Sequence, residues 1–269
     1  MAADTTGAAG ATGTASGTDP ASPRERYRAQ VRAEVKERAW AQVAEAGASA
    51  LSLNAIARQM GMSGPALYRY FAGRDELITA LIRDAYRSLA DAFHAAAHPA
   101  AGPATAPGEE GAAAGHGTEA DNGPGAEADA GTDSGTAAAV RLARTMRRWA
   151  LEDPQRYFLL FGTPVPGYHA PEDTTAIAVE VMGVMLDVCA RLPPPAPDAP
   201  AATAFDAHLR DHRQWAGGHP APPAALHRAL SLWTRLHGLL SLELAGQFDG
   251  MAIDPELFYT AEVEDLLRR

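Results

Sequence analysis

Apolar side chains recur every three or four positions along most of the chain, which is the periodicity of amphipathic helices. The first helix is predicted to begin with Ser22 and Pro23, a capping hydroxyl and a first-turn proline. Gly47 is suited to end this helix. Later segments with the same periodicity are 75–93, 140–152, 154–161, 174–192, 223–247 and 255–267. No segment alternates apolar and polar residues as a strand does, so the pattern predicts an all-α fold.

Two short helices are predicted between residues 52 and 71. Ser52 can cap the first, Gly61 is suited to a left-handed bend, and Ser63 can cap the second. The apolar residues that would pack the two helices together are Leu53, Ile56, Met60, Met62 and Leu67. Two short helices joined by a tight glycine turn form a helix-turn-helix.

The opposite face of the second short helix would remain free. That face carries Gly64, Ala66, Arg69 and Tyr70, with Tyr68 near its edge. Small side chains allow close approach to DNA bases, whereas hydroxyls and guanidinium groups reach phosphates or base edges. A helical hairpin with a glycine turn and no role in DNA binding has the same pattern, so the residues alone leave both interpretations open.

Composition divides the chain into parts. Residues 1–21 lack large apolar side chains after Met1, and we predict that they form a disordered tail. Residues 99–136 are rich in Ala, Gly and Pro and carry seven acids with no Lys or Arg, which predicts a disordered acidic insertion. The predicted domains are an N-terminal helix-turn-helix domain over 22–76 and a helical domain over 77–269 that contains the insertion.

The formal net charge of −10 is unevenly distributed. Residues 22–76 hold nine basic and six acidic side chains, so the N-terminal domain is the part suited to a polyanion. Cys189 is the single cysteine and cannot form an intramolecular disulfide, which favours a cytoplasmic protein. No segment reaches the roughly 18 consecutive apolar residues of a membrane-spanning helix, so no membrane association is expected.

The segments ALSLNAIA (50–57), MGMSGPALYRYF (60–71) and RDEL (74–77) closely resemble the N-terminal domain of the TetR family of transcriptional regulators. The resemblance extends over about 24–90, and its Leu-Tyr-x-x-Phe signature follows the glycine turn. It implies that the partner is a double-stranded DNA operator and that Arg74 contacts a phosphate. The residues that it implies face DNA are Asn54, Ser63, Gly64, Ala66, Tyr68 and Tyr70.

The segment LWTRLHGLLSLELAG (232–246) is similar to the Trp-His-Gly motif of one class of C-terminal domain in TetR-like regulators. This similarity implies a homodimer in which the last two helices of each subunit pair. Gly238 would allow close helix approach, although a local kink would also explain it. The candidate interface residues are Leu239, Leu242, Leu257 and Leu266.

The resemblance also implies a small-molecule effector site in the C-terminal bundle. The candidate lining residues are Met146, Trp149, Tyr157, Phe158, Phe161, Met182, Met185, Trp233 and His237. Their scarcity of charge favours a largely hydrophobic effector. Taken singly, each side chain is explained more simply as core, and His237 beside Trp233 as a core histidine with one hydrogen-bond partner.

No catalytic or nucleotide-binding motif is present in the sequence. His208 and His212 have the spacing of metal ligands but lack a firm third ligand, so a solvated helix is the simpler interpretation. We therefore predict no catalytic residue, no metal and no cofactor. The favoured function is a ligand-responsive transcriptional regulator, most simply a repressor. The alternatives are a helical small-molecule binding protein without a DNA function and a metal-dependent helical enzyme.

Overall fold

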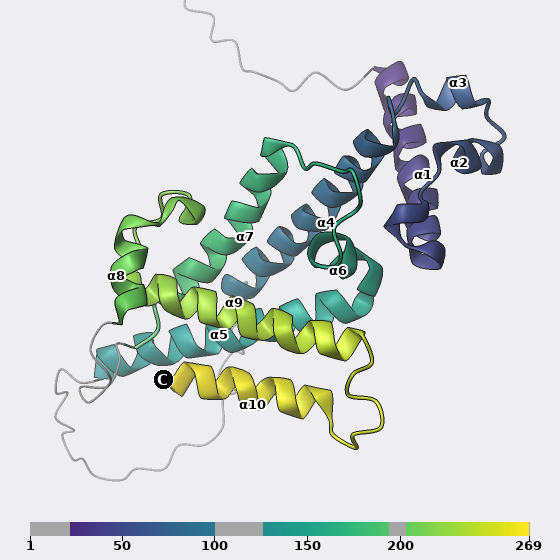
Figure 1. The fold of residues 1–269 in the computed structure, drawn as a ribbon. Helices are drawn as coiled ribbons and strands as arrows, with labels where there is room; N and C mark the ends of the chain where they lie inside the picture. The colour runs from purple at the N-terminus through teal and green to yellow at the C-terminus, as the bar shows by residue number, and fades with distance from the viewer. Residues whose placement is uncertain (1–21, 100–125, 194–202, 269) are drawn as a thin grey trace, which may run out of the picture.

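The computed structural model describes residues 22–99, 126–193 and 203–268 (Figure 1). Within these ranges the chain forms helices and no strand, which confirms the all-α prediction. The N-terminal elements are α1 (Pro23–Ala46), the 3₁₀ helix η1 (Ala48–Ala50), α2 (Leu53–Gln59), α3 (Gly64–Leu67) and α4 (Arg74–Ala97). The later elements are α5 (Ala126–Glu152), α6 (Pro154–Phe161), α7 (Glu172–Ala190), α8 (Ala204–Asp211), the 3₁₀ helix η2 (Gln214–Ala216), α9 (Pro223–Leu244) and α10 (Pro255–Arg268).

Several helices begin or end at capping residues, among them the predicted Ser22 and Gly47. At the start of α1, the Glu25 amide donates to the Ser22 hydroxyl and the Ser22 amide donates to the Glu25 carboxylate, which forms a capping box. Gly47 follows the helix with a positive φ of 76°. The Asp153 carboxylate accepts from the Arg156 amide and caps α6. These boundaries depend on residues close together in the chain.

Two hydrophobic cores share helix α4. Its first half contributes Leu77, Ile78, Leu81 and Ile82 to a core with α1, α2 and α3. Its second half enters the C-terminal core and contributes residues from Leu89 onward. In Figure 1, α4 runs from the N-terminal helices into the C-terminal bundle. The boundary predicted after residue 76 therefore falls inside the N-terminal core, because one continuous helix belongs to both parts.

The C-terminal bundle is built around α7, which contacts α4, α5 and α9. Its side chains Val181, Val184, Met185 and Leu186 are buried, as its apolar composition predicts for a central helix. Helix α8 contacts α9, and α10 lies against α9 and α5 (Figure 1). Among the helices in the described ranges, none combines the length and apolar character needed to cross a bilayer.

Most of the predicted acidic insertion lies outside the described residues. Residues 1–21 and 100–125 lie outside the described residues, so disorder there stays a prediction. Residues 126–136 form the first turns of α5, whereas the insertion was predicted to extend to residue 136.

Candidate functional site

Helix α2 ends in a Schellman turn at the predicted glycine. Gly61 has a positive φ of 64°, and its amide donates to the carbonyl of Arg58 at 3.2 Å. The Met62 amide donates to the carbonyl of Ala57 at 2.9 Å. These two bonds satisfy carbonyls at the end of the helix and reverse the chain. The turn therefore brings the next helix across α2.

Helix α3 is shorter than the sequence predicted. The Ser63 hydroxyl accepts from the Ala66 amide at 3.4 Å, but regular helix covers only Gly64–Leu67. Single turns continue to Tyr70, and Phe71 is fully buried. Beyond Leu67 the amides of Arg69 and Tyr70 donate to carbonyls three residues earlier, and their own carbonyls accept from arginines of α1.

Most residues that were expected to face DNA are accessible on α2 and α3. Asn54, Ser63, Tyr68 and Arg69 are exposed. Gly64, Ala66 and Tyr70 are half-buried. A Cβ atom on Gly64 would lie 3.3 Å from Asn54 Oδ1, so the beginnings of α2 and α3 adjoin each other. We call the set Asn54, Ser63, Gly64, Ala66, Tyr68, Arg69 and Tyr70 the reader surface.

Arg74 has a different environment from the one that the resemblance implied. Its Nη2 donates to the carbonyls of Ala48 at 3.0 Å and Ser49 at 3.3 Å. These bonds attach the start of α4 to η1. A phosphate contact would have to use the remaining donors of the guanidinium group, which has five in all.

Two arginines of α1 and one acid of α4 were missed by sequence reasoning. Arg28 and Arg32 reach the carbonyls at the end of the α3 segment, and Glu76 accepts from the Ala72 amide at 2.6 Å. This amide is the main cause that lowers the pKa of Glu76. The four-residue spacing of the arginines placed them on one face of α1, but no local pattern revealed their partners.

The predicted effector-pocket residues of α6 and α9 come together as one aromatic cluster, which consists of Tyr157, Phe158, Phe161, Trp233 and His237. The His237 ring centroid lies 4.3 Å from that of Phe161 and 4.1 Å from that of Trp233. The Tyr157 ring lies 5.3 Å from Phe161 and 5.7 Å from Phe158. Met146, Trp149, Met182 and Met185 belong to the surrounding hydrophobic core.

His237 is only partly satisfied in this cluster. The Tyr157 hydroxyl lies 3.0 Å from His237 Nδ1 and 2.9 Å from the Ser241 hydroxyl. Burial lowers the pKa of His237 to about 4, so its ring is neutral near pH 7. Its Nε2 is buried, and no group in the described part of the chain is placed to bond it. An orphaned polar atom of this kind is a candidate partner for a ligand.

Two depressions adjoin the bundle at other places. A groove of about 510 Å³ lies between the end of α7 and helices α8, α9 and α10, and its lining includes Leu192, Asp206 and Leu232. A cleft of about 300 Å³ separates α6, at Phe158 and Leu159, from the end of α1 and η1. Helix α6 therefore contributes to the aromatic cluster and also faces the end of α1 and η1 across this cleft.

The candidate interface leucines differ in exposure. Leu242 and Leu257 are 46% and 69% exposed, whereas Leu266 is half-buried. Leu239 is 7% exposed and lies in the core of the subunit, so we remove it from the candidate interface. The sequence could not separate these leucines because both faces of α9 carry apolar residues. Other exposed apolar residues on the α9–α10 hairpin are Met251, Ile253 and Phe258.

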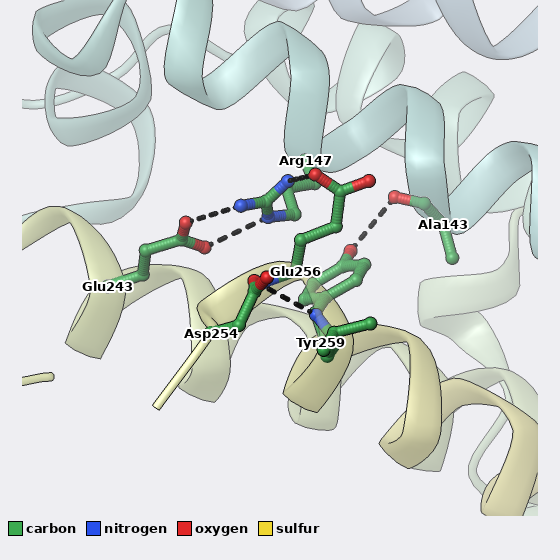
Figure 2. A network of polar contacts seen from close by, with 7 residues as sticks. Ala143, Arg147, Glu243, Asp254, Glu256 and Tyr259 are labelled. Carbon is green, nitrogen blue, oxygen red and sulfur yellow. Dashed lines mark hydrogen bonds and ion pairs between the residues drawn. The ribbon is translucent and has the colours of Figure 1, made fainter. Parts of the chain in front are cut away.

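An ion-pair network attaches this hairpin to α5 (Figure 2). Arg147 binds both carboxylate oxygens of Glu243, with distances of 2.7 Å and 3.1 Å, and it lies 3.3 Å from Glu256. Both carboxylates raise the pKa of Arg147. The buried Tyr259 hydroxyl donates to the Ala143 carbonyl at 2.9 Å. These contacts set the position of α10 relative to α5 and α9.

The histidines considered as metal ligands stack on each other. The ring centroids of His208 and His212 are 3.9 Å apart and nearly parallel. Asp206, in the same helix, pairs with His227 at 2.8 Å. Across 22–99, 126–193 and 203–268, no group of three His, Cys, Asp or Glu side chains is placed to hold a metal ion.

Comparison with known proteins gives matches to both parts of the chain. The family described as "Bacterial regulatory proteins, tetR family" matches residues 37–81, which contain α2 and α3. The family described as "Tetracyclin repressor-like, C-terminal domain" matches residues 139–266. Neither description separates the Trp-His-Gly class, which stays a prediction.

Related proteins cover almost the whole chain. The HTH-type transcriptional regulators Rv1816 of Mycobacterium tuberculosis and Mb1846 of Mycobacterium bovis are each 32% identical over 254 residues, which cover 91% of this chain and 94% of theirs. The crystal structure of the regulatory protein SCO4313 is 56% identical, with a TM-score of 0.71 over 92% of this chain and all of that one. The regulator PfmR of Thermus thermophilus shares the fold at 16% identity and a TM-score of 0.51, over 87% of this chain and 97% of PfmR.

Proposed function

Because the chain belongs to the TetR family of HTH-type transcriptional regulators, we propose that it is a ligand-responsive repressor. It binds a pseudo-palindromic operator as a homodimer and leaves the operator when a small hydrophobic effector enters the C-terminal bundle. The observation that carries the DNA-reading part is the Schellman turn at Gly61, which presents the reader surface next to the N-terminal core.

The reader surface has the side chains that major-groove recognition needs. Gly64 and Ala66 add little bulk, so the backbone of α3 can approach base edges. Tyr68 is 47% exposed and Arg69 is exposed, and both offer donors to phosphates or bases. Two copies in a dimer would enter major grooves about 34 Å apart.

The aromatic cluster supports the effector part of the proposal. The cluster is mostly apolar, and its buried His237 Nε2 has no hydrogen-bond partner among the described residues. An aromatic or apolar effector with one hydrogen-bonding group at that nitrogen would fit this chemistry. Entry of such a ligand has to displace part of α6, because Tyr157 and Phe161 pack directly on α9.

Helix α6 is the element that would transmit effector binding to the N-terminal core, which carries the reader surface. Phe158 and Leu159 face the cleft whose other wall is the end of α1 and η1. The Tyr168 hydroxyl, which follows α6, lies 3.0 Å from the Thr79 hydroxyl of α4. A shift of α6 would therefore change contacts with the N-terminal core. The effect on operator affinity is limited by the differential affinity of the effector for the two states, commonly about 1 to 3 kcal/mol.

The exposed hairpin of α9 and α10 supports the homodimer. Leu242 and Leu257 expose large apolar side chains there, with Met251 and Ile253 near them in the chain. Several large apolar side chains exposed on one hairpin favour burial against a second copy.

The test is operator binding by purified protein and its Tyr68→Ala variant. Fluorescence anisotropy with DNA from upstream of its own gene should show saturable binding by the parent protein, and footprinting should locate a pseudo-palindrome. Tyr68→Ala should bind this site at least several-fold more weakly. Phe205→Ala is the matched control, because Phe205 is 43% exposed but lies on α8 in the other domain. A protein that binds no such DNA would instead support the small-molecule binding alternative.

A further inference from the structure

The segment between α3 and α4 is held by side chains from α1 and α4. After Leu67 the chain makes single turns to Tyr70, so the carbonyls of Arg69 and Tyr70 lie beyond the last residue of α3. Arg28 Nη2 lies 3.4 Å from the Arg69 carbonyl, and Arg32 Nη1 donates to the Tyr70 carbonyl. Both guanidinium groups come from α1, about forty positions earlier in the chain.

Arg32 makes three kinds of contact at this point. Besides the Tyr70 carbonyl, its Nη1 and Nη2 lie 3.2 Å and 3.3 Å from Glu76 Oε1. Its Cζ lies 4.0 Å from the centroid of the buried Phe71 ring. A planar guanidinium can combine these contacts, whereas an ammonium group is a single point of charge.

Glu76 completes the arrangement from α4. Its Oε2 accepts from the Ala72 amide at 2.6 Å, while Oε1 receives Arg32. The backbone from Tyr70 to Ala72 is therefore bound on its carbonyl side by α1 and on its amide side by α4. This backbone directly follows the reader surface.

We propose that Arg32 and Glu76 form a clamp that sets the orientation of the reader surface, so that Arg32 acts as a positioning residue for operator recognition. The inference rests on the proposed role of the reader surface in reading DNA. Base contacts depend on placement within a fraction of an ångström, whereas non-specific binding depends mainly on charge near the phosphates. The clamp should therefore control operator binding more than binding to unrelated DNA.

The experiment compares Arg32→Gln with a matched ion pair. Lys36 and Asp84 lie further along the same two helices and also join α1 to α4, at 2.5 Å, so Lys36→Gln removes the same charge from the same helix. Binding of both variants to the operator and to an unrelated duplex is measured by anisotropy over a range of salt concentrations. Hydrogen exchange is measured over residues 64–73 of the full chain.

We expect Arg32→Gln to weaken operator binding on the order of tenfold and to leave both the unrelated-duplex affinity and the salt slope unchanged. Exchange over 64–73 should accelerate. Arg32→Lys should recover only part of the operator affinity, because it keeps the charge but loses the planar group. Lys36→Gln should behave like the parent in every measurement.

Two results would overturn the proposal. One is unchanged operator affinity in Arg32→Gln. The other is an equal loss on both duplexes with a salt slope shallower by about 0.9, which is the signature of a lost phosphate contact. If circular dichroism shows that Arg32→Gln does not fold, Glu76→Gln gives the same test. This variant removes the charge that pairs with Arg32, while the amide oxygen of the glutamine can still accept from the Ala72 amide.

Tyr68→Ala separates failure of the clamp from failure of the proposed function. If Tyr68→Ala loses operator binding and Arg32→Gln does not, the clamp is wrong and the reader surface stands. If neither variant changes operator binding, the reader surface itself is wrongly assigned.

Discussion

Removal of one partner from the Arg147–Glu243 pair should strongly destabilise the C-terminal bundle. The two side chains are only 16% and 12% exposed, and they join α5 to α9 through two hydrogen bonds (Figure 2). Glu256 adds a third contact from α10, but its side chain is 73% exposed and therefore well screened. The perturbation that we consider is Arg147→Met, which removes the positive charge and retains much of the apolar stem.

The expected cost follows from the charge that is left behind. Arg147→Met leaves the Glu243 carboxylate nearly buried without a cation, and removal of one partner of a buried pair typically costs about 3 to 5 kcal/mol. We expect about 3 kcal/mol, because some exposure remains. In a protein of this size, that corresponds to a fall in Tm of roughly 6 to 12 °C. The double variant Arg147→Met/Glu243→Leu should recover most of the loss, since neither charge remains to be desolvated.

The assay is urea unfolding followed by circular dichroism at one fixed protein concentration, because dimerisation would contribute to the apparent stability. Arg148→Met is the control. Arg148 pairs with Glu152 at 3.9 Å one turn along the same helix, and both side chains are largely exposed. An exposed pair of this kind contributes at most about 0.5 kcal/mol.

The reasoning would be refuted if Arg147→Met cost less than about 1 kcal/mol, since a nearly buried carboxylate without a cation should cost more. It would equally be refuted if the double variant were as unstable as the single one, because the loss would then come from packing and not from the uncompensated charge.

Three further predictions concern the turn, the buried histidine and the hairpin. Gly61→Ala should lower the free energy of unfolding, measured in urea, by about 1 kcal/mol and weaken operator binding, because alanine is strained at the φ of +64° that residue 61 adopts. The control is Gly73→Ala, which should change stability little because Gly73 lies in extended backbone. Burial holds the pKa of His237 at about 4, below the 6.5 of an exposed histidine, so the unfolded chain takes up its proton first and stability is lost as the pH falls from 6.5 to 4. His237→Gln should remove up to about 3 kcal/mol of this loss in urea titrations at several pH values, and an unchanged pH profile would contradict the burial argument. Leu257→Arg should yield monomers in sedimentation equilibrium, whereas an intact dimer would place the interface elsewhere.

The helix-turn-helix could be predicted from the sequence because its determinants are local. The Ser22 cap and the Gly61 turn each depend on residues within five positions of one another. The apolar periodicity of α1 and α4 likewise marks the faces that are buried. Interactions of this range are set by backbone geometry and survive in any tertiary context that keeps the helix.

The parts that the sequence could not supply involve partners far apart in the chain. Arg32 meets Tyr70 across 38 positions, and Arg147 meets Glu243 across 96. No periodicity encodes such a pairing, because it depends on how two helices are docked. Arg74 shows the same limit, since its position at the start of α4 did not reveal that η1 carbonyls would bind it.

The sequence by itself determined that the chain is helical, where some of the helices begin, and that a glycine turn joins α2 to α3. Only the tertiary structure decided that Leu239 is buried while Leu242 is exposed, and that His237 Nε2 lies among aromatic rings with no partner from the described residues. The physical reason is that capping and periodicity act within one or two helical turns, whereas burial and pairing of side chains depend on which helices pack against them.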